Sequence, residues 1–266
     1  MPIRTSGRGL LTATLALVLA PPGAARAQER PIERAEYQVK VGALSAGSGT
    51  MEVGRTTLAG RDVYHAVLRI RGGLGPAKVD DRFESWGDAA AWEDGRNVFS
   101  RRFAQDQREL GKRRQRTYEF DPERRQYRRT DPGAPAEMLR LPTDQPLDDV
   151  AVLYLARSLP LKVGDTYTIN RYFKADANPI VLRVVRRDTV TVPAGRFATV
   201  VVRPTIKTSG LFSEGGEAEI HFSDDQYHTL VQLRSKVRLV GSLSLHLRRY
   251  DRPAVGPAAP GGRGRL

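Results

Sequence analysis

Two carboxylates in the segment KVDDRFES, Asp80 and Glu84, come closest in this sequence to the type and spacing of a catalytic pair. On a β-strand these two side chains share a face with Arg82, whereas Asp81 points to the opposite face. Paired carboxylates could hydrolyse a glycosidic bond by acid–base catalysis. The alternating charges also describe a ladder of ion pairs with a neighbouring strand, and we favour this structural interpretation.

No other motif predicts catalysis or a cofactor. The sequence contains no nucleophile elbow, zinc-protease motif, phosphate-binding loop or dinucleotide fingerprint, and it has no cysteine. The four histidines are far apart, and each falls at a polar position of a predicted strand or turn: His65, His221, His228 and His246. We therefore expect neither a metal site nor a cofactor.

An arginine-rich hairpin from Val98 to Asp121 is more informative. A short loop at Leu110-Gly111 sets a register that is defined by three pairs: Phe103 with Tyr118, Arg102 with Glu119, and Glu109 with Lys112. The side chains expected on the solvent-facing side of this hairpin are Ser100, Asp106, Arg113, Gln115 and Thr117.

The inward face of the same hairpin begins aromatic and becomes basic toward the loop. Its polar members are Arg101, Gln105, Gln107, Arg114 and Arg116. Because guanidinium groups bind carboxylates and phosphates in a bidentate manner, this face could form the mouth of a cavity that holds an amphiphile with an anionic head. Alternatively, the hairpin tip projects beyond the core, and the arginines only keep it in solution.

A second basic surface is predicted in the last hairpin, between Val231 and Leu247. A three-residue loop, Val240-Gly241-Ser242, pairs Leu239 with Leu243 and keeps the apolar residues on one face. The basic residues of the outer face are Arg234, Lys236 and Arg248, with Arg234 opposite Arg248 and Lys236 opposite His246. Such a stripe could bind an anionic surface or could simply be solvated.

The elements that position these groups are organised around one predicted helix, residues 143–159. Thr143 or Asp144 can cap its first turn, and Asp148 and Asp149 add negative charge near the positive end of the helix dipole. Apolar residues occupy nearly the whole circumference, which is typical of a buried helix.

Almost all of the remaining sequence alternates between apolar and polar residues, as β-strands do. Gly47-Ser48-Gly49 is expected to lie near a turn, and Gly72-Gly73-Leu74-Gly75-Pro76 is expected to end the strand Val63–Arg71. The predicted fold is mainly β: a strongly curved antiparallel sheet or partly open β-barrel packed around the single helix. Two β units on either side of the helix are the alternative.

Several segments in order carry a family resemblance: KVDDRFES, FAQDQRELGKRRQRTYEFDPE, LDDVAVLYLARSL, LKVGDTY, VPAGRFATVVVRP and SDDQYHTLVQLRSKVRLVGSLSLHL. Over about Tyr37 to Leu247, the chain resembles the bacterial domain of unknown function 3108 family. The resemblance implies an exported, β-rich envelope protein, and it brings no established reaction and no catalytic residues.

The N-terminus predicts export. Residues 1–27 combine a basic start, the apolar run Leu10–Ala20 and an Ala25-Arg26-Ala27 cleavage site, which together describe a secretory signal peptide. We expect a single domain over residues 28–250 and a disordered tail rich in Pro, Gly and Arg over residues 251–266. No second apolar run is long enough to span a membrane. The predicted location is the periplasm of a Gram-negative-type bacterium.

The charge of the chain is strongly positive. The net charge is +13, and removal of the three arginines of the signal peptide leaves +10. Export argues against nucleic acid as the partner, so the candidate anions are lipid headgroups, lipopolysaccharide phosphates and cell-wall polymers. The alternative is that the arginine content reflects a GC-rich genome.

These features support three functional hypotheses. The first is a non-enzymatic envelope accessory factor or carrier for an amphiphilic or anionic envelope component. The second is a hydrolase of envelope polysaccharide that uses Asp80 and Glu84. The third is a structural or assembly partner that binds anionic envelope surfaces through its basic residues. The sequence does not decide the oligomeric state.

Overall fold

The computed structural model describes residues 32–75, 77–95, 97–109, 111–206, 218–237 and 241–251 of the 266-residue chain. The strands that it contains are β1 (Glu33–Val41), β2 (Leu44–Leu58), β3 (Arg61–Leu74), β4 (Ala77–Asp88), β5 (Ser100–Glu109), β6 (Lys112–Asp121), β7 (Gln126–Thr130), β8 (Glu137–Arg140), β9 (Thr166–Ile169), β10 (Ile180–Val192), β11 (Gly195–Thr205), β12 (Glu219–Ser223), β13 (Leu230–Val237) and β14 (Gly241–Asp251).

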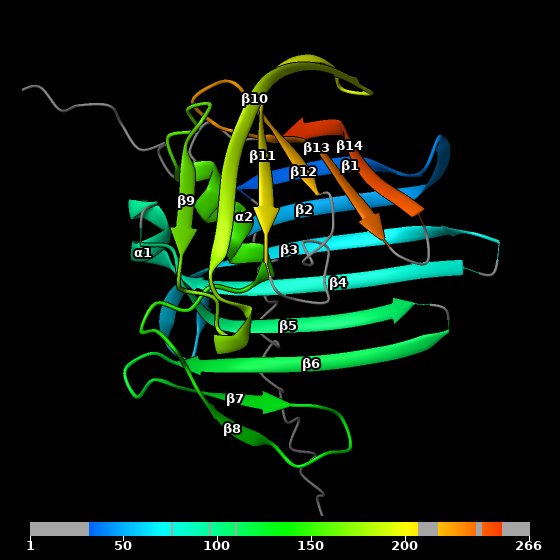
Figure 1. Ribbon diagram of the computed structural model, residues 1–266. Helices are drawn as coiled ribbons and strands as arrows, with labels where there is room; N and C mark the ends of the chain where they lie inside the picture. Colours follow the sequence, from blue (N-terminus) through cyan, green and yellow to red (C-terminus); the bar gives the residue numbers. More distant parts are fainter. Residues whose placement is uncertain are drawn as a thin grey trace, which may run out of the picture.

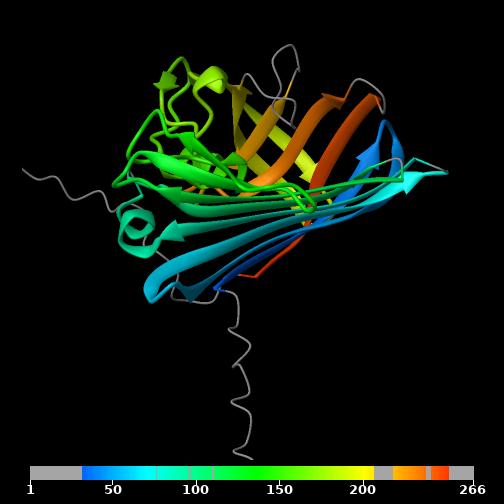
Figure 2. The same cartoon turned by 90° about the horizontal axis from the view of Figure 1, so that it is seen from below.

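All of these strands form one antiparallel sheet in the order β8-β7-β6-β5-β4-β3-β2-β1-β14-β13-β12-β11-β10-β9. The sheet is strongly curved and does not close, so that β8 and β9 are its edge strands (Figures 1 and 2). The predicted mainly β, open architecture is therefore confirmed. A single continuous sheet also replaces the alternative of two separate β units.

The described residues contain two α-helices, α1 (Ala89–Asp94) and α2 (Asp149–Ser158), and a 3-10 turn at Ala175–Ala177, whereas the sequence predicted only one helix. Helix α2 also begins later than predicted, because its N-cap is Asp148 and not Thr143 or Asp144. The Asp148 side chain accepts hydrogen bonds from the first-turn amides, and these bonds fix the helix start. The preceding Leu147 instead forms a bridge to Tyr172.

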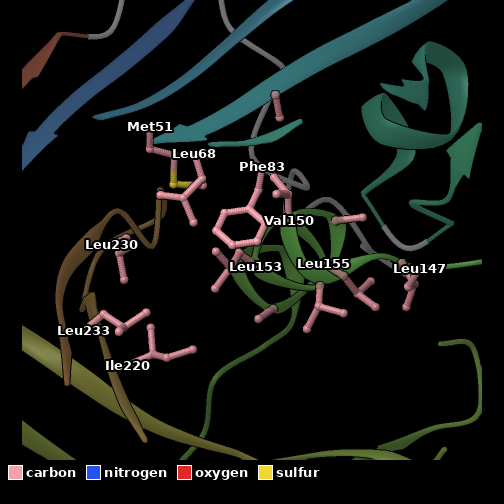
Figure 3. Packing of buried hydrophobic residues seen from close by; sticks show 14 of the residues in the cluster. Met51, Leu68, Phe83, Leu147, Val150, Leu153, Leu155, Ile220, Leu230 and Leu233 are labelled. Atoms are coloured by element: carbon pink, nitrogen blue, oxygen red, sulfur yellow. The ribbon is translucent and has the colours of Figure 1, made fainter. Parts of the chain in front are cut away.

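The apolar side chains of α2 belong to one buried cluster together with residues of distant strands. Figure 3 shows members of this cluster from α2, from β2 to β4 and from β12 and β13: Val150, Leu153, Leu155, Met51, Leu68, Phe83, Ile220, Leu230 and Leu233. Burial of this apolar surface stabilises the contacts between α2 and the strands that contribute to the cluster.

The break predicted over Gly72 to Pro76 lies at the end of that segment, because β3 continues to Leu74, and the turn predicted near Gly47 to Gly49 lies earlier, between β1 and β2. Gly47 lies within β2, Gly72 lies within β3, and the two residues pair with each other. A Cβ on Gly47 would lie 1.9 Å from the carbonyl oxygen of Arg71, and one on Gly72 would lie 2.2 Å from that of Ala46. These glycines therefore allow the two strands to approach closely inside the sheet and do not end either strand.

The two predicted hairpin registers have opposite outcomes. The register of β5 and β6 is confirmed, because Phe103 pairs with Tyr118 and Arg102 pairs with Glu119. The register of β13 and β14 is wrong, because Arg234 pairs with Ser244 and not with Arg248. The observed and predicted partners of Arg234 are four residues apart on β14, and a shift by an even number of residues keeps every side chain on its face, so the apolar pattern does not distinguish the two registers. Leu239 and Val240 lie outside the described residues.

Both ends of the chain also lie outside the described residues. The predicted signal peptide falls within residues 1–31, and most of the predicted tail falls within residues 252–266. Asp251, which was expected to begin the tail, is the last residue of β14. Within the described part of the chain, no helix has the length and apolar character needed to cross a membrane.

Candidate functional site

A cleft of about 500 Å³ is lined by residues of the β2–β3 turn, the start of β5 and the end of β6. The residues that line it are Leu58, Ala59, Arg61, Val63, Arg101, Arg102, Glu119, Phe120, Asp121, Glu123 and Arg124. The cleft thus combines four arginines with an apolar wall. The residues of its two sides are far apart in the sequence.

A β-bulge brings Arg101 and Arg102 together in this cleft. Trp86 pairs with Arg102, but the next residue of β4, Gly87, pairs with Ser100, so that β5 has an extra residue at this point. The bulge changes the alternation of side chains along β5. Ser100, which was predicted to face solvent, is therefore fully buried, while Arg101 leaves the face that carries Phe103.

Gly87 makes the bulge sterically feasible. A Cβ at this position would lie 1.7 Å from Nε1 of Trp92 in α1, which packs directly on the strand. The same indole nitrogen donates a hydrogen bond to the carbonyl oxygen of Phe99, 3.2 Å away, and so connects α1 to the segment before the bulge. The cleft therefore lies next to a close contact between Trp92 and β4 that leaves no room for a side chain at Gly87.

We expect Gly87→Ala to lower the free energy of unfolding by about 1–3 kcal/mol, because the added methyl group displaces the Trp92 indole. Denaturant unfolding, followed by circular dichroism, measures the change. Gly111→Ala is a poor control because Gly111 has a positive φ of 78°, whereas Ala104→Gly, on β5 beyond the bulge, tests only the loss of a methyl group. An unchanged midpoint for Gly87→Ala would show that the indole has room to move.

Most of the charged groups in the cleft are already neutralised. Arg101 contacts the carboxylates of Glu123, at 2.8 Å, and Asp88, at 3.4 Å. Arg124 pairs with Asp121 at 3.2 Å. The pKa of Glu123 is held below its ordinary value by the hydrogen bond from Arg101. Glu123 is therefore an ionised partner of Arg101 and not a proton donor.

Arg102 differs from the other arginines of the cleft. Its Cζ lies 4.9 Å from the centroid of the Trp86 ring, and the His65 ring stacks on Trp86 at 4.4 Å and 8°. Its cross-strand neighbour Glu119 bonds instead to Arg128, with Nε 2.8 Å from Oε2. Within the described residues, no carboxylate pairs with Arg102, and its buried Nε has no hydrogen-bond partner. The guanidinium is thus held in place, and its charge is available for a ligand.

The proposed catalytic carboxylates lie on the face of β4 predicted for them, but each is engaged in ion pairs. Asp80 Oδ1 lies 3.1 Å from Arg69 and 3.3 Å from Arg71, and Glu84 accepts a hydrogen bond of 2.7 Å from Arg82. The structure thus contains the charge ladder that we favoured over catalysis.

Neither carboxyl group of the ladder can serve as a proton donor near neutral pH. Although desolvation raises it, the pKa of Asp80 is lowered overall by the hydrogen bonds from Arg69 and Arg71. Burial likewise raises the pKa of Glu84, but the hydrogen bonds from His65 and Arg82 bring it down to about 2.

The predicted ligand-binding residues of the long hairpin do not form one group. Gln105 donates to Asp149 Oδ2 at 3.4 Å, and Arg116 pairs with Asp131 at 3.2 Å. Arg101 belongs to the cleft, Gln107 is half-buried, and Arg114, near the loop, is exposed. Of the five, only Arg101 lines the cleft.

The predicted basic stripe is also dispersed. Arg234 and Arg248 are both exposed, but Arg234 of β13 pairs with Ser244 of β14 and not with Arg248. The side chain of Lys236 lies outside the described part of the chain. His246 pairs with Gln232, whose side-chain nitrogen lies 2.9 Å from His246 Nδ1. The observed register therefore contains neither of the two like-charge pairs that were predicted for this hairpin, Arg234 with Arg248 and Lys236 with His246.

Among the described residues, no three or more histidine, aspartate or glutamate side chains are grouped so as to hold a metal ion. His65 lies 2.9 Å from Glu84, whereas His221 is almost fully buried beside Thr199. Desolvation lowers the pKa of His221 and, with the charges of Lys40 and Arg234, lowers that of His246 to about 4.

The sequence did not single out two features that the structure brings forward. One is the Trp86–Arg102 stack, which joins β4 to β5, whereas the sequence predicted only the register between β5 and β6. The other is Asp148, which is completely buried and whose pKa burial raises to about 7 despite hydrogen bonds from Ser85 and from the amide of Ala151. A pair of adjacent acids at a helix start was the available signal, and it was interpreted only as dipole charge.

The fold defines an open antiparallel β protein. The family model for "Protein of unknown function (DUF3108)" matches residues 36–248, and the chain belongs to this family, as its sequence motifs predicted. No curated protein matches the sequence.

Two solved structures match the chain at low sequence identity. The chain is similar to a β-barrel-like protein of domain of unknown function DUF1849 from Brucella abortus, with 12% identity, a TM-score of 0.47, and coverage of 82% of this chain and 96% of the other. It is also similar to a protein with a YmcC-like fold from Bacteroides fragilis, with 11% identity, a TM-score of 0.28, and coverage of 84% and 97%.

Proposed function

We propose that this protein is a non-enzymatic, exported binding protein that holds the anionic group of an envelope component in the cleft beside the β2–β3 turn. The observation that carries the proposal is Arg102. Its guanidinium lines the cleft, stacks on Trp86, and has no carboxylate partner among the described residues. A buried or half-buried cation without a partner is costly, and an anionic ligand would offset that cost.

The geometry of the stack suits anion binding. Stacking on an aromatic ring fixes the plane of a guanidinium group and leaves its N–H edge free for the two oxygens of a carboxylate, sulfate or phosphate. Because Trp86 is itself covered by the His65 ring, Arg102 loses little conformational freedom when a ligand binds. The site is therefore preorganised for binding, and the two lining carboxyl groups whose pKa values are lowered by arginines, Asp121 and Glu123, are poor proton donors for hydrolysis.

The concave side of the sheet is less suited to carry a ligand. Leu155 is 3% exposed, and Tyr154 packs at 4.8 Å on Trp92 of α1. The helix side chains thus occupy the space that an enclosed apolar cargo would need. We therefore assign α2 a supporting role inside the curved sheet, and we place the binding function at the cleft.

Export supplies the context for this ligand. The signal-peptide pattern of residues 1–27 directs the chain out of the cytoplasm, and we place it in the periplasm. The anions that are abundant there are phospholipid headgroups and lipopolysaccharide phosphates. A mature chain with a net charge of +10 is attracted to such surfaces, and the cleft adds a specific contact to this general attraction.

The test is binding to vesicles that contain phosphatidylglycerol, with vesicles of pure phosphatidylcholine for comparison. We expect Arg102→Ala to weaken sedimentation with the anionic vesicles about tenfold, because the one unpaired guanidinium of the cleft is lost. Arg113→Ala is the matched control, since it removes an arginine from the same face of the hairpin that is paired with Asp106 outside the cleft.

Salt separates specific from general attraction in the same assay. Exposed charges are screened at high ionic strength, so the general attraction, to which Arg113 contributes, should disappear first as salt is added. The specific contact with Arg102 should persist to higher salt concentrations. Equal binding by Arg102→Ala and Arg113→Ala at every salt concentration would contradict the assignment of the ligand to the cleft.

A further inference from the structure

The charges around the cleft do not cancel. Five arginines take part, namely the four that line it and Arg128, and they face four carboxylates, those of Asp88, Glu119, Asp121 and Glu123. One positive charge is therefore left over, and it lies on Arg102, the only one of the five that has no carboxylate contact within the described residues. A ligand that completes this arrangement brings one negative charge.

The wall on the other side of the cleft is apolar. Leu58 and Ala59, at the β2–β3 turn, and Val63, at the start of β3, line it together with Phe120 of β6. Val63 and Phe120 are buried, whereas Ala59 is exposed and Leu58 is half-buried, so the part of this wall that is open to the cleft consists of Leu58 and Ala59. An apolar chain attached to the anionic group would be removed from water against these residues.

From these two observations, and resting on the proposed function, we infer that the cleft binds a singly charged anion that carries an apolar chain, and that it discriminates against a doubly charged head. The second charge of a dianion has no free guanidinium within the described residues. It would instead lie among Glu119, Asp121 and Glu123, and the ion pairs of these carboxylates would have to break to accommodate it.

The inference also identifies the residue that sets the selectivity. Arg124 lines the cleft, but Asp121 holds its guanidinium through a contact of 3.2 Å. Removing the charge of Asp121 releases Arg124 and gives a dianion a second partner. Asp121→Asn therefore changes the charge preference of the site while it leaves Arg102 and Trp86 in place.

The experiment is calorimetric titration of the full mature chain at pH 8.5 with probes that share one chain length. Octyl sulfate is a monoanion at this pH, octyl phosphate is almost entirely a dianion, and octyl glucoside is neutral. We expect octyl sulfate to bind at least fivefold more tightly than octyl phosphate and octyl glucoside not to bind. Methyl sulfate, which lacks the chain, should bind at least tenfold more weakly than octyl sulfate.

The variants make the outcomes distinguishable. Arg102→Ala should abolish octyl sulfate binding, and Asp121→Asn should strengthen octyl phosphate binding severalfold with little change for octyl sulfate. Octyl phosphate binding as tightly as octyl sulfate to the unaltered chain would overturn the inference of a single charge. Failure of both octyl probes, with vesicle binding that still depends on Arg102, would overturn the inference and leave the proposed function standing. Vesicle binding that does not depend on Arg102 would remove the proposed function itself.

Discussion

Replacing Glu33 with alanine should lower the free energy of unfolding by about 3–5 kcal/mol, because it leaves the Arg157 guanidinium buried without its partner. Glu33 is the first residue of β1, and Arg157 lies in the last turn of α2. The Arg157 guanidinium donates hydrogen bonds of 2.6 and 3.1 Å to the Glu33 carboxylate. Their exposed fractions are only 11% and 10%. The pair therefore connects the helix to the strand that pairs with β14 in the middle of the sheet.

Denaturant unfolding of the variant measures this loss, and Arg34→Ala is its matched control. Arg34 is the next residue of β1, and it forms ion pairs with Glu36 and Glu52, but its side chain is 41% exposed. An exposed pair contributes at most about 1 kcal/mol, so the control should change the midpoint little.

A double variant distinguishes the cost of an unpaired charge from the value of the pair. Glu33→Leu with Arg157→Met removes both charges, and we expect it to be more stable than Glu33→Ala alone. If Glu33→Ala cost no more than Arg34→Ala, the guanidinium of Arg157 would have to reach water in the variant, and the pair would not hold the helix in place.

The accuracy of the sequence-based predictions followed the strength of the local restraint. The β5–β6 register was predictable because the aromatic pair Phe103 and Tyr118 and the turn at Gly111 agree on one alignment. The last hairpin has only alternating leucines and valines, which fit equally well after a shift of four residues, and the predicted pairing of Arg234 with Arg248 was wrong. Alternation determines the face on which each side chain lies, but it does not determine which residue of the neighbouring strand is its partner.

The candidate site was less predictable because it depends on contacts between distant segments. The bulge at Arg101 follows from the packing of Trp92 against Gly87, and no pattern within β5 indicates it. The stack of His65, Trp86 and Arg102 needs the order β3-β4-β5 in addition to the strand assignments. The predicted Asp80 and Glu84 face was right, and Arg82 of the same strand pairs with Glu84, but the arginines that pair with Asp80, Arg69 and Arg71, come from the neighbouring strand β3.

The other large effect is expected at Asp148, where two substitutions should differ strongly. Asp148 Oδ1 accepts hydrogen bonds of 2.9 Å from the amides of Val150 and Ala151, and Oδ2 accepts one of 2.6 Å from Ser85. Alanine leaves all three donors without a partner inside the protein, whereas asparagine keeps the cap and can bond to the Ser85 hydroxyl. We expect the alanine variant to be less stable than the asparagine variant by about 2–4 kcal/mol.

This comparison is made at a single pH by denaturant unfolding, since neither substituted side chain titrates. Ser85→Ala serves as the control for the third bond, and it should cost only part of the difference because the helix cap remains. Equal stability of the alanine and asparagine variants would mean that the first turn of α2 finds other acceptors, and that Asp148 does not fix the helix start.

The pH dependence of the unsubstituted chain provides the independent test of this buried carboxyl group. In the unfolded chain Asp148 releases its proton near the ordinary pKa of 3.8, whereas burial in the folded chain raises its pKa to about 7. Between these values the folded state binds more protons, so the contribution of Asp148 to stability is fully present below about pH 4 and is lost as the pH rises to about 7.

The Asp148→Asn variant has no titrating proton at this position. The asparagine variant should therefore gain stability relative to the unsubstituted chain by up to roughly 1.4 kcal/mol per pH unit across this window, and the difference should become constant above it. Parallel stability curves for the two chains from pH 4 to 8 would show that the folded protein already holds Asp148 as a carboxylate, sustained by its hydrogen bonds to the helix start and to Ser85.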